Sequence, residues 1–327
     1  MDWNLSVSID QKSSFKPIGY DQRLLLLGSC FSEHIGHYLE TYKFQSVQNP
    51  FGILYNPKSI GKAIQSILDR KVYTEEDLMQ FNERWLSLDH HSKFSDTAPN
   101  TVLERINAAI ERSNLWLTTA HTIIITFGTA FFYRLDASGE VVGNCHKIPA
   151  NQFTRAKLTV KEITEEYSSL MDAVHQVNKN VQWIFTVSPV RHWKDGATAN
   201  NWSKSTLNCA IHDLVQNNSS AHYFPSYEIM MDELRDYRFY KEDMVHPSDQ
   251  AVNHIWKRFV ESSMDPSAFK LMDQMEEIKR ACEHRPFNFQ SNQHQSFIKN
   301  TLNKIKALRT EHPYLDFGAE ENKLIKE

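Results

Sequence analysis

Four apolar runs constrain the fold of this chain more than any other feature. Each is rich in β-branched, leucine or aromatic residues, and each stops at a turn residue. They are residues 23–27 before Gly28, 122–127 before Gly128, 181–187 before Ser188-Pro189, and 221–224 before Pro225. Runs that stay apolar throughout are typical of strands buried on both faces, as in a parallel sheet.

Stretches with apolar residues at helical spacing separate these runs. They cover residues 57–69, 101–117, 160–178 and 203–216. Strands that alternate with helices predict a doubly wound α/β fold, in which helices cover both faces of the sheet. Ligands bind such folds at the carboxyl ends of the strands.

Two segments fall outside this pattern. Residues 131–143 predict a small hairpin, inserted beside the main sheet. Residues 264–327 are rich in Met, Glu, Lys and Gln and predict a helical appendage, interrupted at Arg285-Pro286. We therefore expect a main domain over 1–263 and a helical extension over 264–327. The extension packs on the domain or on a partner, so self-association through it is an expectation.

Composition narrows the functional classes. A net charge of -4 gives no basic footprint for nucleic acid, and no apolar run approaches the ~20 residues of a membrane span. The first residues lack the pattern of a signal peptide. The four cysteines are widely spaced and form no paired motif, so we expect a reducing, cytoplasmic compartment.

The segment Gly28-Ser29-Cys30 directly follows the strongest predicted strand and precedes a helical stretch over 34–42. A cysteine at a helix N-terminus has its thiolate favoured, which suits a nucleophile. The alternative is that Cys30 is a small buried side chain and Ser29 a helix cap.

Asp243 stands three residues before His246. A carboxylate at that spacing can hold Nδ1 of the imidazole, so that Nε2 faces a nucleophile. Arg191 and His192 follow the third strand, where they would orient an anionic or hydroxylated substrate. The alternative for Asp243 and His246 is an exposed ion pair, and the alternative for Arg191 and His192 is a solvated loop.

Further candidates come from three loops. Gly52, in the ordered loop 49–57, is predicted to offer a backbone N–H to an oxyanion, and Thr129 after Gly128 is predicted to add another donor. Asn144 and His146 flank Cys145, but adjacent Cys and His lack the spacing of a zinc site. We expect no metal and no cofactor.

Taken together, these segments resemble the GSCFA family, whose name matches residues 28–32 except for Ser32 in place of Ala. The resemblance continues through residues 49–57, 126–133, 144–147, 186–193 and 237–247. It covers about residues 20–260, whereas the tail lies outside it. The family looks like a branch of the SGNH hydrolases, which implies a three-layer α/β/α fold and a catalytic domain over 1–263.

The resemblance assigns roles by position. The superfamily's first block reads Gly-Asp-Ser, which places Ser29 at the Asp position and Cys30 at the nucleophile position. Asp243 and His246 match its Asp-x-x-His block.

Two more superfamily blocks concern the oxyanion. Gly52 matches the block-two glycine of the oxyanion hole. Gly128 matches the start of Gly-x-Asn, but Ala130 replaces the asparagine, so that Thr129, Asn144 or a backbone amide would have to substitute.

The resemblance implies cleavage of a small-molecule or glycan ester, of the esterase or deacetylase type. His246 would take the proton of Cys30, or of Ser29, and the nucleophile would attack the ester carbonyl. Two alternatives stay open. One is an acyltransferase that modifies a glycan from a thioester donor, and the other is a binding protein without catalysis.

Overall fold

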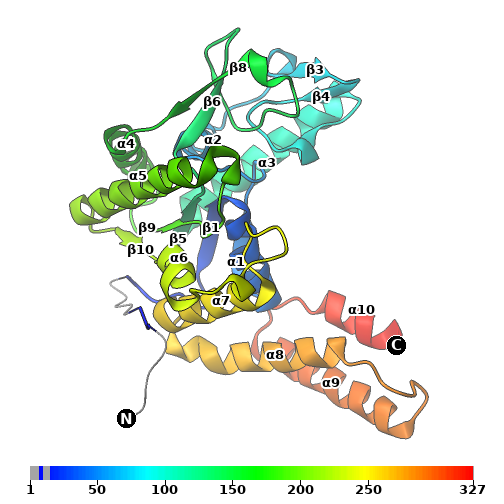
Figure 1. The fold of residues 1–327 in the computed structure, drawn as a ribbon. Helices are drawn as coiled ribbons and strands as arrows, with labels where there is room; N and C mark the ends of the chain where they lie inside the picture. Colours follow the sequence, from blue (N-terminus) through cyan, green and yellow to red (C-terminus); the bar gives the residue numbers. More distant parts are fainter. Residues whose placement is uncertain (1–6, 10–14, 327) are drawn as a thin grey trace, which may run out of the picture.

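The computed structural model describes residues 7–9 and 15–326, and its centre is a five-stranded parallel sheet in the order β10-β9-β5-β1-β2 (Figure 1). The predicted doubly wound α/β fold is thereby confirmed. The strands are β1 (Arg23–Gly28), β2 (Gln45–Gln48), β5 (Thr122–Phe127), β9 (Gln182–Val187) and β10 (Ala221–Tyr223). The short edge strand β2 escaped the sequence analysis because it carries polar, half-buried residues.

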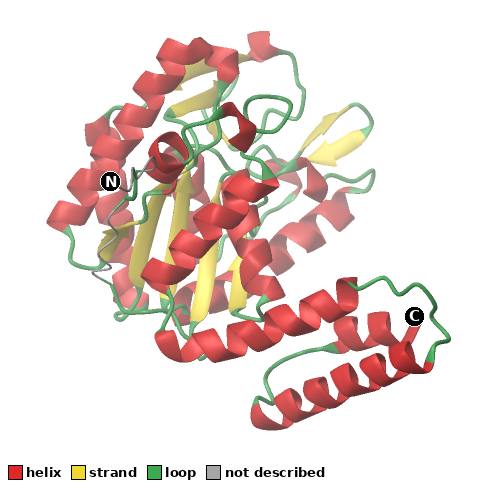
Figure 2. Cartoon of the chain, turned by 60° about the horizontal axis from the view of Figure 1, so that its bottom comes forward, coloured by secondary structure: helices red, strands yellow, loops and turns green. Residues whose placement is uncertain are grey.

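Strand alternation divides the core into two. Leu25, Leu27 and Ile125 face one side of the sheet, whereas Leu24 and Leu26 face the other. Helices cover both sides, so the molecule has three layers (Figure 2). The first core also contains side chains of α2 (Pro57–Leu68), α3 (Pro99–Thr119), α4 (Val160–Val177) and α5 (Gly196–Asn217). The second contains those of α1 (Cys30–Thr41) and α7 (Asp249–Ser263).

Two helices begin earlier than the sequence predicts. The N-terminus of α1 lies at Cys30 rather than His34, since the hydroxyl of Ser29 caps it. Helix α5 starts at Gly196 rather than Ser203. The sequence pattern missed its first turns because they are polar and show no apolar spacing.

The insertion after β5 is larger than the predicted hairpin. Strands β6 (Phe131–Leu135) and β7 (Val141–Val142) pair as expected, but β8 (Phe153–Lys157) adds a third antiparallel strand. A hydrophobic cluster joins this small sheet to the hairpin of β3 (Met79–Phe81) and β4 (Arg84–Leu86). Both insertions lie at the top of Figure 1.

The end of the chain is helical, as expected. A short helix α6 (Ser226–Glu228) follows β10, and α8 (Phe269–Glu283), α9 (Asn292–Glu311) and α10 (Gly318–Lys326) follow α7. These last three helices extend beyond the body of the molecule in Figures 1 and 2. Their apolar side chains nevertheless belong to the same core as α1 and α7. The division into two domains at residue 263 stays a prediction.

Candidate active site

The turn between β1 and α1 places Cys30 at the carboxyl edge of the sheet. Gly28 has φ +143°, and a Cβ there would lie 2.3 Å from the carbonyl oxygen of Thr126, so only glycine fits. Its N–H donates to Oδ1 of Asn49 at 2.9 Å. Ser29 is 1% exposed and caps α1 by accepting the N–H of Phe31. Cys30 is therefore the first residue of the helix.

The thiol of Cys30 is partly buried, and burial raises its pKa. The carboxylate of Glu33 adds to this rise, whereas the ammonium of Lys204 and the N–H groups of Cys30 and Phe31 oppose it. Desolvation thus outweighs the N–H groups at the helix N-terminus, in contrast to the expectation that this position favours the thiolate. Cys30 therefore needs a base to become a nucleophile.

A candidate base comes from the loop before α7. Nδ1 of His246 lies 2.7 Å from Oδ2 of Asp243, while Oδ1 accepts the N–H groups of Val245 at 2.8 Å and His246 at 2.9 Å. These bonds lower the pKa of Asp243 to about 2, the amide of His246 contributing most. Asp243 thus stays ionised and fixes the imidazole, leaving Nε2 free of this bond.

This dyad faces the start of α1. Burial is the main cause that lowers the pKa of His34, one helical turn after Cys30, and the pKa of His192, and His246 makes a smaller contribution to each. The loop before α7 also lies beside α1 in Figure 1. Asp243 and His246 are 49% and 42% exposed, and within the described ranges no hydrogen bond joins His246 to Cys30 or Ser29. The structure therefore brings the two parts near each other without a direct bond.

His192 approaches the turn from inside the molecule. A Cβ atom added to Gly128 would lie 3.5 Å from Nε2 of His192 and 3.3 Å from Cβ of Ser29, so both side chains border the same point. The amide of His192 donates to Oδ1 of Asn200 at 2.9 Å. Nε2 is buried, with no hydrogen-bond partner among the described residues. Burial, assisted by Lys204, lowers the pKa of His192 to about 4, so the ring is neutral at pH 7.

Lys204 on α5 is a site residue that the sequence analysis missed. It is 1% exposed, and its Nζ donates to the carbonyl oxygens of Gly128 at 2.7 Å and Ser188 at 2.6 Å. Burial, then Arg191, lowers its pKa to about 7, and Cys30 opposes this shift. No carboxylate pairs with it in the described part of the chain. A lysine three residues before Leu207, on the apolar face of a helix, was the available signal.

The predicted oxyanion donors are already engaged. The amide of Gly52 donates to the carbonyl of Asn49 at 2.8 Å, and those of Gly128 and Thr129 donate to Tyr55 at 2.8 and 2.9 Å. The hydroxyl of Thr129 lies 3.1 Å from that of Ser203. These groups hold the loops around the turn together, and could reach a substrate only if those bonds broke.

Asn144 and His146 lie in the insertion, between β7 and β8. Oδ1 of Asn144 accepts the amide of His146 at 2.8 Å, and Nε2 of His146 lies 2.9 Å from the carbonyl oxygen of Ser87. No contact in residues 15–326 ties either side chain to Ser29 or Cys30. Through these two bonds, Asn144 and His146 stabilise the loop around residue 87.

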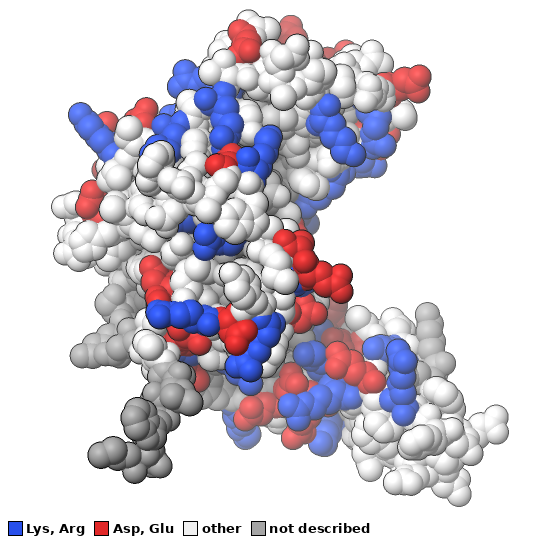
Figure 3. Space-filling view, viewed as in Figure 1, with Lys and Arg blue, Asp and Glu red and all other residues white. Residues whose placement is uncertain are grey.

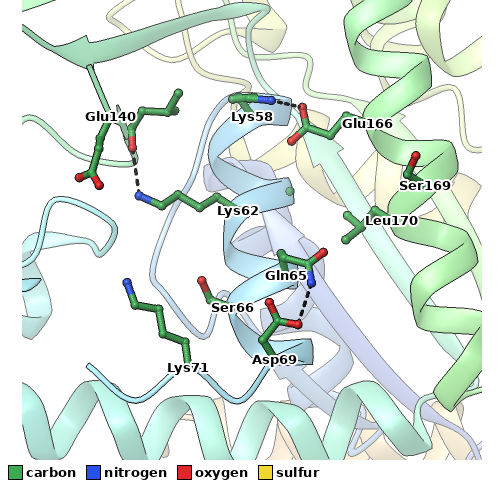
Figure 4. Close-up of a pocket in the computed structure, with 12 residues that line it drawn as sticks. Lys58, Lys62, Gln65, Ser66, Asp69, Lys71, Glu140, Glu166, Ser169 and Leu170 are labelled. Carbon is green, nitrogen blue, oxygen red and sulfur yellow. Dashed lines mark hydrogen bonds and ion pairs between the residues drawn. The ribbon is translucent and has the colours of Figure 1, made fainter. Parts of the chain in front are cut away.

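A cavity of about 810 Å³ lies between α2, α4 and β7 (Figure 4). Its lysines are each paired with a carboxylate: Lys58 with Glu166 at 2.9 Å, Lys62 with Asp89 at 2.6 Å, and Lys71 with Asp77 at 2.8 Å. None of the candidate catalytic side chains lines it. We therefore place the candidate site at the sheet edge.

The described residues contain no group of three or more His, Cys, Asp or Glu side chains arranged to hold a metal ion. None of the helices in the ranges described combines the length and apolar character needed to cross a bilayer.

Comparison with protein families agrees with the motifs. The GSCFA family model matches residues 23–259. This chain belongs to the GSCFA family. A second model, described as the C-terminal domain of GSCFA domain proteins, matches residues 275–327. The tail, which the sequence analysis left outside the resemblance, is therefore also shared with GSCFA proteins. No curated protein sequence matches the chain.

Solved structures are only distantly similar to this chain. A family 3 carbohydrate esterase from Talaromyces cellulolyticus is 9% identical, with a TM-score of 0.38, and the match covers 78% of this chain and 99% of that one. An acetyl xylan esterase from Butyrivibrio proteoclasticus is 10% identical, with a TM-score of 0.38, over 76% of this chain and 64% of that one. At this level of similarity we draw no functional conclusion from them.

Proposed function

We propose that this GSCFA protein cleaves esters through a covalent acyl-cysteine intermediate. The observation that carries the proposal is the Asp243–His246 hydrogen bond of 2.7 Å, on a loop beside the helix that starts at Cys30. A carboxylate-oriented imidazole next to an activatable thiol is the arrangement that nucleophilic acyl transfer requires. The Gly-Ser-Cys and Asp-x-x-His blocks add support from the resemblance to SGNH hydrolases.

The reaction would proceed in two halves. Nε2 of His246 takes the proton from the thiol of Cys30, and the sulfur attacks the ester carbonyl. The carbon–oxygen bond breaks, and the departing alcohol receives the proton from His246. Water, deprotonated by His246, then attacks the thioester, and its proton finally returns to the sulfur. Because no hydrogen bond joins the dyad to Cys30 among the described residues, this mechanism requires the loop that carries the dyad to approach α1 when substrate binds.

Two donors are available for the oxyanion. The N–H of Cys30 lies in the first turn of α1, where backbone donors have no partner inside the helix. The neutral imidazole of His192 can donate through Nε2, which is buried beside Ser29 and unpartnered among the described residues. His192 would then be the side-chain donor to the oxyanion, in place of the asparagine that Ala130 replaces. Removing such a donor typically costs ~2.7–4 kcal/mol of transition-state stabilisation.

Ser29 is a weaker candidate for the nucleophile. Its side chain is 1% exposed and its oxygen caps α1, so an attack would require the helix to give up its cap. We therefore assign the nucleophile to Cys30.

The raised thiol pKa and the half-exposed dyad favour one rival, a protein that binds a ligand on this scaffold without catalysis. The decisive experiment measures aryl ester hydrolysis and Cys30 alkylation in the wild type, Cys30→Ala, Ser29→Ala and His246→Ala. Our proposal expects activity to vanish in Cys30→Ala and to survive, at reduced stability, in Ser29→Ala. Equal turnover by wild type and Cys30→Ala would refute the acyl-cysteine. No turnover by any protein, with slow alkylation of Cys30, would favour the binding scaffold.

A further inference from the structure

A groove of about 400 Å³ borders the loop of the candidate dyad. Two hydrogen bonds tie its wall to that loop: the amide of Arg191 donates to the carbonyl of Val245 at 3.2 Å, and Nε1 of Trp193 donates to that of Met244 at 3.4 Å. The groove is therefore continuous with the segment that holds His246.

The lining of the groove is mostly apolar and adaptable. It includes Met230, Met231 and Leu234, with the aromatic rings of Trp193, Tyr237 and Tyr240. Trp193 is 46% exposed and Tyr237 80%, so large apolar surfaces face solvent at its rim. Exposed aromatic and methionine surface beside a candidate catalytic loop is typical of a ligand site.

One cation in this groove lacks a counter-ion. The guanidinium of Arg191 lies 5.3 Å from the ring of Trp193, and its Nη1 lies 3.4 Å from Sδ of Met231. Its Nε is buried, and among the described residues it has no hydrogen-bond partner and no carboxylate beside it. A guanidinium with a buried N–H that has no partner offers donors in a planar arrangement to a carboxylate or a phosphate.

The other charges of the groove are paired. Nη2 of Arg235 lies 2.7 Å from Oδ1 of Asp232, and Nε of Arg238 lies 3.8 Å from Oδ2 of Asp236. Among the charged side chains that line the groove in the described residues, Arg191 is thus the one without an ion pair, so that an anion fits there better than a neutral group.

We propose that this groove binds an anionic group joined to an apolar chain or ring, with Arg191 holding the anion and Trp193 and the methionines covering the apolar part. The inference rests on the proposed function, because it makes this group the part of the ester substrate that lies beyond the scissile bond. Carboxylate and phosphate share the required chemistry, and the experiment separates them.

The test has a binding arm and a turnover arm. Calorimetry measures the binding of hexanoate, hexyl phosphate and hexanol to the wild type, Arg191→Met and Arg235→Met. Kinetics compares aryl hexanoate with the aryl hemiadipate, which has the same chain length and a terminal carboxylate. Arg235→Met is the matched control, because Arg235 lines the same groove but is already paired. Thermal unfolding checks that Arg191→Met is folded.

We expect one or both anions to bind the wild type and Arg235→Met roughly tenfold or more tightly than Arg191→Met, and hexanol to show no such difference. KM for the hemiadipate should rise similarly in Arg191→Met alone. If anion binding follows this pattern while neither ester is hydrolysed, the result supports the anion site in the groove and contradicts the proposed function. If esters are hydrolysed but Arg191→Met changes neither anion binding nor the KM of the hemiadipate, the inference is overturned.

Discussion

At the scale of single residues, burial sets the protonation of the groups around Cys30. The thiol keeps its proton because it is partly desolvated, and His192 stays neutral for the same reason. Lys204 is the buried cation that opposes the rise in the pKa of Cys30. The pKa of the thiol therefore depends on the balance between its burial with the charge of Glu33, which raise it, and Lys204, which lowers it.

Replacing Lys204 with methionine tests this balance. We expect the pKa of Cys30 to rise, because a charge that lowers it is removed, and alkylation at pH 7 to slow several-fold. The measurement is iodoacetamide labelling against pH, with Cys30 followed by mass spectrometry. Lys62→Met is the control, since Lys62 is paired with Asp89 in the remote cavity. An unchanged titration of Cys30 in a folded Lys204→Met variant would contradict this account.

His90 gives the protein a second pH-dependent feature. The ring is fully buried, stacked on Phe51 at 4.2 Å with Nδ1 3.0 Å from the hydroxyl of Ser87, and burial lowers its pKa to about 3. An unfolded histidine binds a proton below pH ~6.5. The unfolding free energy should therefore fall between pH ~6.5 and about 3, by up to ~1.4 kcal/mol per pH unit from this residue.

Urea unfolding of wild type and His90→Phe at pH 7, 6, 5 and 4 isolates this contribution. The variant loses the bond to Ser87, so the slopes against pH are compared rather than the absolute values. The wild type should lose stability more steeply as the pH falls. Parallel curves would show that His90 is protonated in the folded protein.

At the scale of elements, the turn from β1 into α1 is the most constrained segment of the site. Asn49 holds the amide of Gly28, the carbonyl of Gly28 accepts the amide of Leu54, and Ser29 caps the helix. The loop 49–57 therefore positions the turn through its backbone and one side chain, rather than by presenting Gly52 to a substrate.

Gly28→Ala should destabilise the protein by on the order of 3 kcal/mol, since the new Cβ would lie 2.3 Å from the carbonyl oxygen of Thr126. Gly139→Ala is the control: it also has positive φ, at +71°, but nothing lies within 4 Å of its Cβ position. It should cost about 1 kcal/mol. Chemical unfolding of both variants measures the difference, and equal losses would argue against the clash.

The elements also show what the sequence could reveal. Apolar runs and helical spacing predicted four of the five strands of the central sheet and the helices around it, because buried elements carry an unbroken pattern. Strands β2 and β8 were missed because edge strands are only half buried. Asp243 and His246 are near in sequence, so their bond was predictable. The neighbourhood of Lys204 depends on contacts across 76 residues, which no local pattern encodes.

At the scale of the whole molecule, one apolar core joins the sheet to the C-terminal helices. Ile278 on α8, Ile305 on α9 and Leu324 on α10 belong to the same cluster as Ile35 on α1. On the face shown in Figure 3, basic and acidic side chains are mixed, with no broad region of one sign. This shared apolar core therefore packs the tail against the body.

Phe317→Ala should reduce the unfolding free energy by ~3–5 kcal/mol, because this fully buried ring fills the shared core before α10. Phe287→Ala is the control, since Phe287 is exposed in the loop between α8 and α9 and should change stability by less than ~0.5 kcal/mol. Denaturant unfolding followed by tryptophan fluorescence compares the two variants. Similar losses for both would mean that the tail does not depend on this ring.

The C-terminal end of α1 meets the tail through two polar contacts. The hydroxyl of Tyr42 donates to Glu276 at 2.9 Å, and Nζ of Lys43 lies 2.7 Å from Glu320. The same helix begins at Cys30, so a single helix connects the candidate nucleophile to the last helices of the chain. If tail binding by a partner changes the reactivity of Cys30, linkage requires that modification of Cys30 change the affinity of that partner by the same factor.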